Sequence, residues 1–202
     1  TKLTRKLHDT ARLHPQRVVF AEGGNPTMLK AAVQAKNEGI CEPILLGNPD
    51  RLNRVASRLK LDLSSIEIVD MRADNEQGRR AKFAKHLAEK RAREGYSFEE
   101  AYDKMYERNY FGMSMVEADA FITGLYTKYS NTIKVAKDVI GIRDEYKTFG
   151  TMHILNTQKG VYYIADTLIN RHPDEDVLTD IAKLSAGTVK FFNEEPVMAM
   201  LS

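Results

Sequence analysis

A group of hydroxyl side chains around a glycine, near the middle of the chain, could bind an oxygen-rich ligand. The group consists of Thr123, Gly124, Tyr126, Thr127, Tyr129 and Ser130. Hydroxyl donors beside a flexible glycine can surround a carbonyl or phosphate oxygen without a formal charge. Lys128, Lys134 and Arg143 could supply positive charge nearby. The same pattern is also typical of a turn and a helix cap, so both interpretations stay open.

Two further polar residues, Asp166 and Asn170, follow an apolar run later in the chain. Lone polar residues after a strand more often cap a turn than take part in catalysis. We nevertheless expect Asp166 and Asn170 to lie near the junction of two lobes.

Two other stretches could bind a phosphate group. The Gly-rich EGGNPT turn at 22–27 could offer backbone N–H groups, although such turns mostly serve chain geometry. The charged helical stretch from 75 to 108, with Arg79, Lys82 and Lys85, is either a solvated helix face or a phosphate-binding face.

Several kinds of site have no support in the sequence. The five histidines show no ligand spacing, and neither HExxH nor CxxC occurs, so we predict no metal site in this segment. The motifs GxSxG, GxxxxGK[ST] and GxGxxG are also absent, which leaves hydrolase, P-loop and Rossmann dinucleotide functions without support. The single cysteine, Cys41, precedes a predicted strand and fits a small buried side chain better than a nucleophile.

The elements that must position these residues alternate between strands and helices in the first part of the chain. The predicted elements are a helix over 1–14, strands over 17–21, 43–47 and 65–70, and helices ending at Glu38 and Leu59. Strands joined through helices pair in parallel by right-handed crossovers. The sequence therefore predicts an α/β fold with a parallel sheet.

The second part of the chain breaks this alternation. The predicted elements are a buried strand over 118–124, a helix capped by Ser130 and Asn131 and ending at Gly141, an antiparallel hairpin of 149–156 with 161–169, a helix from Pro173 to about Phe192, and a strand over 197–201. We therefore predict two lobes, a first α/β lobe over 1–140 and the start of a second lobe over 141–202. An apolar strand pattern at the very end of the sequence favours a fragment of a longer polypeptide.

Composition favours a soluble globular protein in the cytoplasm. The chain is 43% hydrophobic, and its net charge of +2 comes from 30 basic and 28 acidic side chains, which indicates neither nucleic acid nor a membrane surface as a partner. No apolar run is long enough to cross a bilayer, and the first residues lack a secretory signal. One cysteine suits a reducing compartment.

Six stretches together resemble the phosphotransacetylase (phosphate acetyl/butyryltransferase) family. They are RVVFAEG, PILLG, EADAFITG, VIGIRDEYKTFGTMHIL, IADTLIN and EEPVMAMLS. More narrowly, IGIRDEYKTFGTM looks like the phosphotransacetylase-type C-terminal region of the large bacterial malic enzymes. Those enzymes oxidatively decarboxylate malate to pyruvate with NADP.

The resemblance implies a two-lobed, three-layer αβα fold of the isocitrate/isopropylmalate dehydrogenase type, with the cleft between the lobes and dimerisation through the second lobe. It implies an acyl-phosphate or acetyl-CoA pocket that includes Thr123, Gly124, Thr127, Ser130, Lys134 and Asp166. The family's serine-arginine and aspartate cluster is expected beyond Ser202, so no catalytic residue is carried over. NADP and a divalent metal are expected in the catalytic half of a parent malic enzyme.

Three functions stay open. In the malic enzymes this region is similar to a regulatory module in which bound acetyl-CoA inhibits the distant catalytic half. True acetyltransferases carry an arginine-proline pair within the segment that corresponds to 131–136, where this chain has Lys134. The alternatives are therefore a regulatory and oligomerising module, an active phosphate acetyltransferase that makes acetyl phosphate from acetyl-CoA and phosphate, and a structural dimerisation domain.

Overall fold

The computed structural model describes residues 2–115 and 119–201. The chain forms two compact units, one of Leu7–Gly141 and one of Thr1–Lys6 together with Ile142–Ser202. Each unit is described by itself below. The assignment of 1–140 and 141–202 to two lobes stays a prediction.

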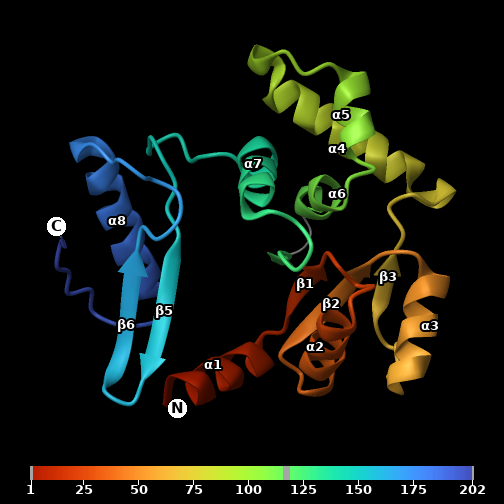
Figure 1. Cartoon of the computed structure of the whole chain (residues 1–202), viewed down its shortest axis with the longest axis horizontal. Coiled ribbons are helices and arrows are strands. Elements are labelled where there is room, and N and C mark those ends of the chain that lie inside the picture. Colours follow the sequence, from red (N-terminus) through yellow and green to blue (C-terminus); the bar gives the residue numbers. More distant parts are fainter. Residues whose placement is uncertain (1, 116–118, 202) are drawn as a thin grey trace. The chain divides into compact units, whose positions relative to one another are not determined.

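The first unit contains a four-stranded parallel sheet (Figure 1). Its strands are β1 (Gln16–Phe20), β2 (Cys41–Leu46), β3 (Glu67–Val69) and β4 (Ala120–Ile122), in the spatial order β3-β2-β1-β4. The helices α2 (Pro26–Asn37) and α3 (Pro49–Leu59) follow β1 and β2. The predicted α/β class is therefore confirmed.

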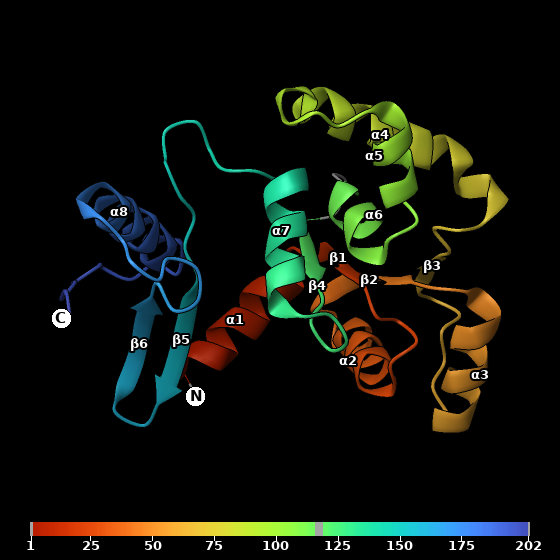
Figure 2. The ribbon, with the colours of Figure 1, turned by 45° about the horizontal axis from the view of Figure 1, so that its top comes forward.

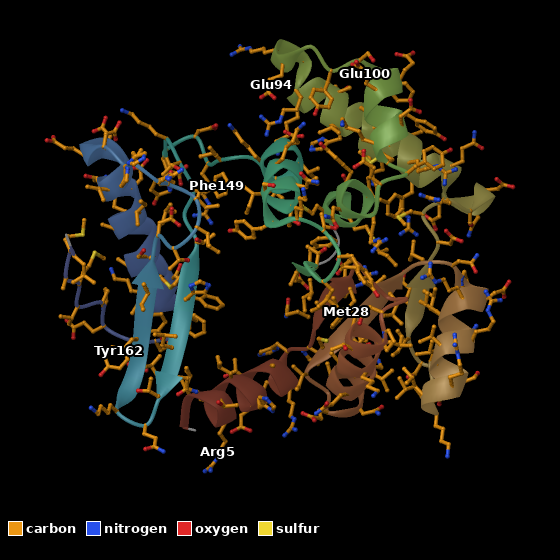
Figure 3. All side chains as sticks on the ribbon, in the orientation of Figure 1. Arg5, Met28, Glu94, Glu100, Phe149 and Tyr162 are labelled. Atoms are coloured by element: carbon orange, nitrogen blue, oxygen red, sulfur yellow. The ribbon has the colours of Figure 1, made fainter. Side chains whose placement is uncertain are left out.

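Helices cover both faces of this sheet (Figure 2). Val18 and Phe20 of β1 join a buried cluster with α2 and α3, and the alternate residue Val19 joins a cluster with the other helices. Those helices are α4 (Gln77–Lys90), α5 (Phe98–Lys104), α6 (Arg108–Ser114) and α7 (Tyr129–Val139), with short 3-10 turns at Asp74–Glu76 and Ala92–Glu94. Met28 of α2, labelled in Figure 3, belongs to the first of these clusters. The unit thus has three layers.

Local capping signals set the helix starts where the sequence predicts them. Asn25 and Asn48 each precede a proline at the first helical position and accept hydrogen bonds from backbone N–H groups of the first turn. Ser97 and Glu100 form a capping box at the start of α5. These predicted helix starts are confirmed.

Three local predictions in this unit are wrong. The strand predicted over 118–124 is shorter and less buried than expected: it is β4, and Ala120 and Ile122 in it are exposed. β4 is exposed because it lies at the edge of the described sheet and pairs only with β1. Residue 118 lies outside the described residues. α7 begins at Tyr129 with Lys128 as N-cap and no side-chain cap, so Ser130 and Asn131 do not cap it. Cys41 is the first residue of β2 and does not precede that strand.

The second unit contains the predicted hairpin. β5 (Met152–Thr157) pairs antiparallel with β6 (Gly160–Ala165), and α8 (Glu175–Phe191) begins after Asp174, whose side chain accepts from Val177 N. α1 (Lys2–Leu13) is the predicted N-terminal helix, and the division between the units falls within it. Residues 197–201 form no strand, and Val197 is 95% exposed, because no strand in the described part of the chain pairs with this segment.

None of the described helices is both long enough and apolar enough to span a lipid bilayer.

Candidate ligand site at the strand ends

The strand order creates a switch point at the carboxyl ends of β1 and β4. From β1 the chain goes outward to β2 and then β3, whereas β4 pairs with the opposite side of β1. The loops that follow β1 and β4 therefore lead away from each other. In open α/β sheets, ligands bind in the crevice outside such a point.

Glu22, two residues after the end of β1, connects the two loops. It is 2% exposed, and its Oε1 accepts hydrogen bonds from Thr123 Oγ1 at 3.2 Å, Gly124 N at 3.2 Å and Tyr126 N at 3.4 Å. The Thr123 hydroxyl also lies 3.1 Å from Asn109 Oδ1, so its one proton has two acceptors. Glu22 Oε2 is buried and has no hydrogen-bond partner among the described residues. A single carboxylate thus fixes the start of the loop after β4.

This contact changes what Thr123 and Gly124 can offer a ligand. Their donors point at a carboxylate, and a ligand phosphate would have to compete with that carboxylate at close range. Their role in a pocket stays a prediction, and the geometry favours orientation of the loop over direct contact with an anion.

Thr127, Ser130 and Lys134 are placed differently. Ser130 and Lys134 are exposed and lie one turn apart on α7, and Thr127 is half-buried just before this helix. None of the three side chains has a hydrogen bond or ion pair with another residue in the described ranges. Two hydroxyls and one ammonium group near the start of a helix are therefore free to meet an anionic ligand.

The EGGNPT turn fits a geometric role. Asn25 Oδ1 accepts from Thr27 N at 2.8 Å and from Met28 N at 3.2 Å, so these two N–H groups already have a partner. A Cβ at Gly23 would lie 2.9 Å from Leu46 O, which explains the glycine by close approach of β2.

The C-terminal end of α7 is anchored to α4. Lys90 Nζ donates to Val139 O at 2.8 Å and Ile140 O at 2.7 Å, and Arg91 donates to the carbonyls of Lys137 and Asp138. Burial, and secondarily the nearby Arg91, lowers the pKa of Lys90. These contacts hold the helix that carries Ser130 and Lys134.

A buried aspartate on α7 adds a second anchor. Asp138 Oδ2 accepts from Tyr110 at 2.6 Å and from Tyr96 at 3.1 Å. Burial first, and then the hydrogen bond to Asp138, raises the pKa of the Tyr110 phenol. The sequence pattern did not identify Glu22 or Asp138 as site residues. The one feature that could have identified Glu22 is that an acidic residue follows the predicted strand 17–21.

Asp166 lies in the other unit, at the end of β6, and its carboxylate is saturated by local donors. Oδ1 accepts from Thr151 N and Oγ1, both at 2.8 Å, and Oδ2 accepts from Asn170 N at 2.6 Å and Nδ2 at 2.8 Å. Burial alone would raise the pKa of Asp166, but the hydrogen bonds from Thr151 and Asn170 prevail and lower it to about 2. Asp166 and Asn170 thus organise the turn after the hairpin, as the capping interpretation expects.

Within the described ranges, no group of three or more acidic, histidine or cysteine residues could hold a metal ion.

Comparison with known proteins places these observations in a family. Residues 2–202 match the family described as "Phosphate acetyl/butaryl transferase". The chain is 32% identical to the NADP-dependent malic enzyme of Escherichia coli (strain K12) over 97% of the chain and 26% of that enzyme. It is 29% identical to the phosphate acetyltransferase of Thermoanaerobacterium thermosaccharolyticum over 99% of the chain and 62% of that protein.

Solved structures agree with the sequence comparison. A phosphotransacetylase from Streptococcus pyogenes superimposes with a TM-score of 0.89 at 25% identity, covering 100% of this chain and 61% of that one. The EutD phosphotransacetylase from Staphylococcus aureus gives a TM-score of 0.84 at 25% identity, covering 96% of this chain and 59% of that one. The chain therefore spans less than two thirds of the relatives described.

The strand-end architecture, the family match over nearly the whole chain and the two structural neighbours agree: the chain belongs to the phosphate acetyl/butyryl transferase family, as a phosphotransacetylase-like domain related both to the C-terminal region of NADP-dependent malic enzymes and to phosphate acetyltransferases.

Proposed function

We propose that this domain is a regulatory and oligomerising region of an NADP-dependent malic enzyme and that it binds acetyl-CoA as an effector. The observation that carries the proposal is the match to malic enzymes from three bacteria along almost the whole chain. The parent polypeptide would oxidatively decarboxylate malate to pyruvate in the cytoplasm, with NADP and a divalent metal held in its other half.

The strand-end site supports ligand binding. The side chains of Thr127, Ser130 and Lys134 have no partner in the described ranges, and Glu22 fixes the preceding loop through Thr123 and Gly124. Hydroxyls and one ammonium group suit a thioester carbonyl or a phosphate oxygen. In this proposal Thr123 and Gly124 shape the pocket, and Asp166 shapes the neighbouring turn of its own unit.

Lys134 favours sensing over turnover. An arginine presents a rigid fork that binds phosphate through two parallel hydrogen bonds, whereas a lysine is a flexible point charge. A lysine at this position can attract an acyl-CoA ligand while aligning a reacting phosphate less well. Regulation then requires only that acetyl-CoA binds two assembly states with different affinity.

The exposed apolar side chains of the hairpin support assembly. Ile154, Leu155, Tyr162 and Ile164 are exposed large apolar residues on β5 and β6. Apolar patches on a surface often mark contacts with another protein. We propose that they take part in a homodimer contact of the second lobe.

An active phosphate acetyltransferase is the second candidate, favoured by relatives that carry this name and by the two phosphotransacetylase structures. The deciding assay measures acetyl phosphate formed from acetyl-CoA and phosphate by the purified full-length protein, with a phosphate acetyltransferase as positive control. Binding of acetyl-CoA without turnover supports the regulatory proposal, and robust turnover supports the second candidate. A protein that neither binds nor turns over acetyl-CoA would be a structural domain.

A further inference from the structure

One face of α4 borders a hollow that shares no residue with the strand-end site. The hollow has a volume of about 510 Å³ and is lined by Arg79, Lys82, Phe83, Lys85, His86, Glu89, Ser114 and Met115. Arg79, Lys82 and His86 follow one another at spacings of three and four residues, which places them on the same side of the helix. α4 therefore directs a row of basic side chains toward one cavity.

The charge of this lining is net positive. Lys82 is exposed and has no ion pair among the described residues, and Lys85 lies 4.0 Å from Glu89 in a pair whose side chains are 73% and 65% exposed. Such exposed pairs contribute little and exchange partners readily. Arg79 is already paired, because its Nε lies 3.0 Å from the carboxylate of the buried Glu76. Lys82 and Lys85 are thus the cations available to an anion.

A group of acidic residues in this helical layer lies away from the hollow. Glu94 and Glu100, labelled in Figure 3, lie near the C-terminal end of α4 and line a different surface depression with Asp103 and Glu107. The hollow itself contains one acidic residue, Glu89, against Arg79, Lys82 and Lys85, so its lining is basic.

The wall of the hollow is apolar and includes one serine. Phe83 is 8% exposed and Met115 is 5% exposed. The ring of Phe83 packs edge-on against the ring of Phe111, with 5.3 Å between the ring centroids. Ser114 is 6% exposed and lines the hollow, and its hydroxyl makes no hydrogen bond with the described residues. A hydroxyl without a protein partner at the wall of a cavity can donate to an acceptor bound there.

We propose that this hollow binds a phosphorylated small molecule, with its phosphate near Lys82, Lys85 and the Ser114 hydroxyl and its apolar body against Phe83 and Met115. A phosphate oxygen accepts from ammonium and hydroxyl donors, and imidazole N–H of His86 adds a further donor. A purely solvated helix face explains the lysines, but it does not explain why the apolar side chains of Phe83 and Met115 and the unbonded Ser114 hydroxyl line one cavity beside them. The inference is independent of acetyl-CoA binding at the strand ends.

Phenyl phosphate is a suitable probe because it joins one phosphate to one aromatic ring. In 1H–15N and methyl NMR titrations of the 202-residue chain, we expect saturable shifts at Phe83, His86, Ser114 and Met115. Phenol has only the aromatic ring and inorganic phosphate has only the phosphate group, so each should bind more weakly than phenyl phosphate. Saturable shifts confined to Thr127, Ser130 and Lys134 would instead place the phosphate site at the strand ends and overturn the inference.

Variants separate a specific site from general attraction to a basic surface. Lys82→Glu with Lys85→Glu should weaken phenyl phosphate by about tenfold or more, as expected for the loss of charged donors. Ser114→Ala should also weaken the binding of phenyl phosphate. Circular dichroism should show that this variant keeps the fold of the original chain. The matched control is Lys30→Glu on α2, which is exposed and outside the hollow. Equal weakening by the control, or unchanged affinity in the charge-reversed variant, would contradict the proposal.

Discussion

At the scale of single residues, Glu22 is the side chain on which the candidate site most depends. Its Oε1 receives three donors from the loop after β4. Glu22→Ala would leave those donors without their acceptor, so we expect the free energy of unfolding to fall by about 1–3 kcal/mol. Hydrogen exchange at the Gly124 and Tyr126 amides should accelerate at the same time.

Denaturant unfolding and residue-resolved exchange measure both effects. Glu145→Ala is the control, because Glu145 is exposed and makes no hydrogen bond or ion pair with the described residues. If Glu22→Ala left both the unfolding free energy and the exchange at residues 124 and 126 unchanged, Glu22 would not hold this loop.

The lowered pKa of Asp166 predicts how the stability of the chain depends on pH. Its folded-state pKa, about 2, is below that of an unfolded aspartate. Its contribution to stability is therefore complete above about pH 4 and is lost as the pH falls through 2. Asp166→Asn should be less stable than the original chain at pH 7, and the difference should shrink at pH 2.5.

Urea titrations at the two pH values test this prediction. Asp144→Asn, a change at an exposed residue, should show no comparable difference at either pH. A gap between Asp166→Asn and the original chain that stays constant from pH 7 to pH 2.5 would show that the charge of Asp166 contributes nothing.

At the scale of elements, α6 packs on the sheet at a glycine. A Cβ at Gly112 would lie 2.4 Å from Cε2 of Phe121 on β4 and 2.9 Å from Cδ1 of Leu46 on β2. Gly112→Ala should therefore destabilise the chain by about 1–3 kcal/mol through overpacking. Adding Phe121→Leu should recover part of the loss in thermal unfolding, whereas additive losses would show that the contact with Phe121 is not the cause.

Local signals made much of the fold predictable, because a cap or a turn is written in neighbouring residues. Asn25-Pro26, Asn48-Pro49 and the Ser97–Glu100 box predict helix starts that the structure confirms. Apolar runs alone were less informative. Residues 197–201 have a strand-like pattern, but a strand also needs a neighbour, and no described strand pairs with them.

The candidate site was less predictable because its key contact joins distant parts of the chain. Glu22 and Thr123 are separated by 101 positions, and only the order β3-β2-β1-β4 brings the ends of β1 and β4 together. Hydroxyl-rich composition pointed to the loop that Glu22 contacts, and its role as a ligand site stays a prediction. It could not show that Thr123 and Gly124 face a carboxylate while Ser130 and Lys134 face solvent.

At the scale of the whole molecule, the chain is one part of a family architecture. It covers 26% of the Escherichia coli malic enzyme and 61% of the Streptococcus pyogenes phosphotransacetylase. Related domains occur both inside a larger enzyme and in phosphate acetyltransferases. This distribution fits a fold in which ligand binding is kept while the reaction differs between proteins. On this account, α7 is the element that distinguishes sensing from turnover.

Isothermal titration of acetyl-CoA into the 202-residue chain, and into its Lys134→Glu and Lys30→Glu variants, tests this account most directly. We predict saturable binding by the original chain, binding weaker by about tenfold in Lys134→Glu, as for a lost charged donor, and no change in Lys30→Glu. Absence of saturable heat in the original chain, or equal affinity in all three proteins, would contradict the assignment of an acetyl-CoA site to the start of α7.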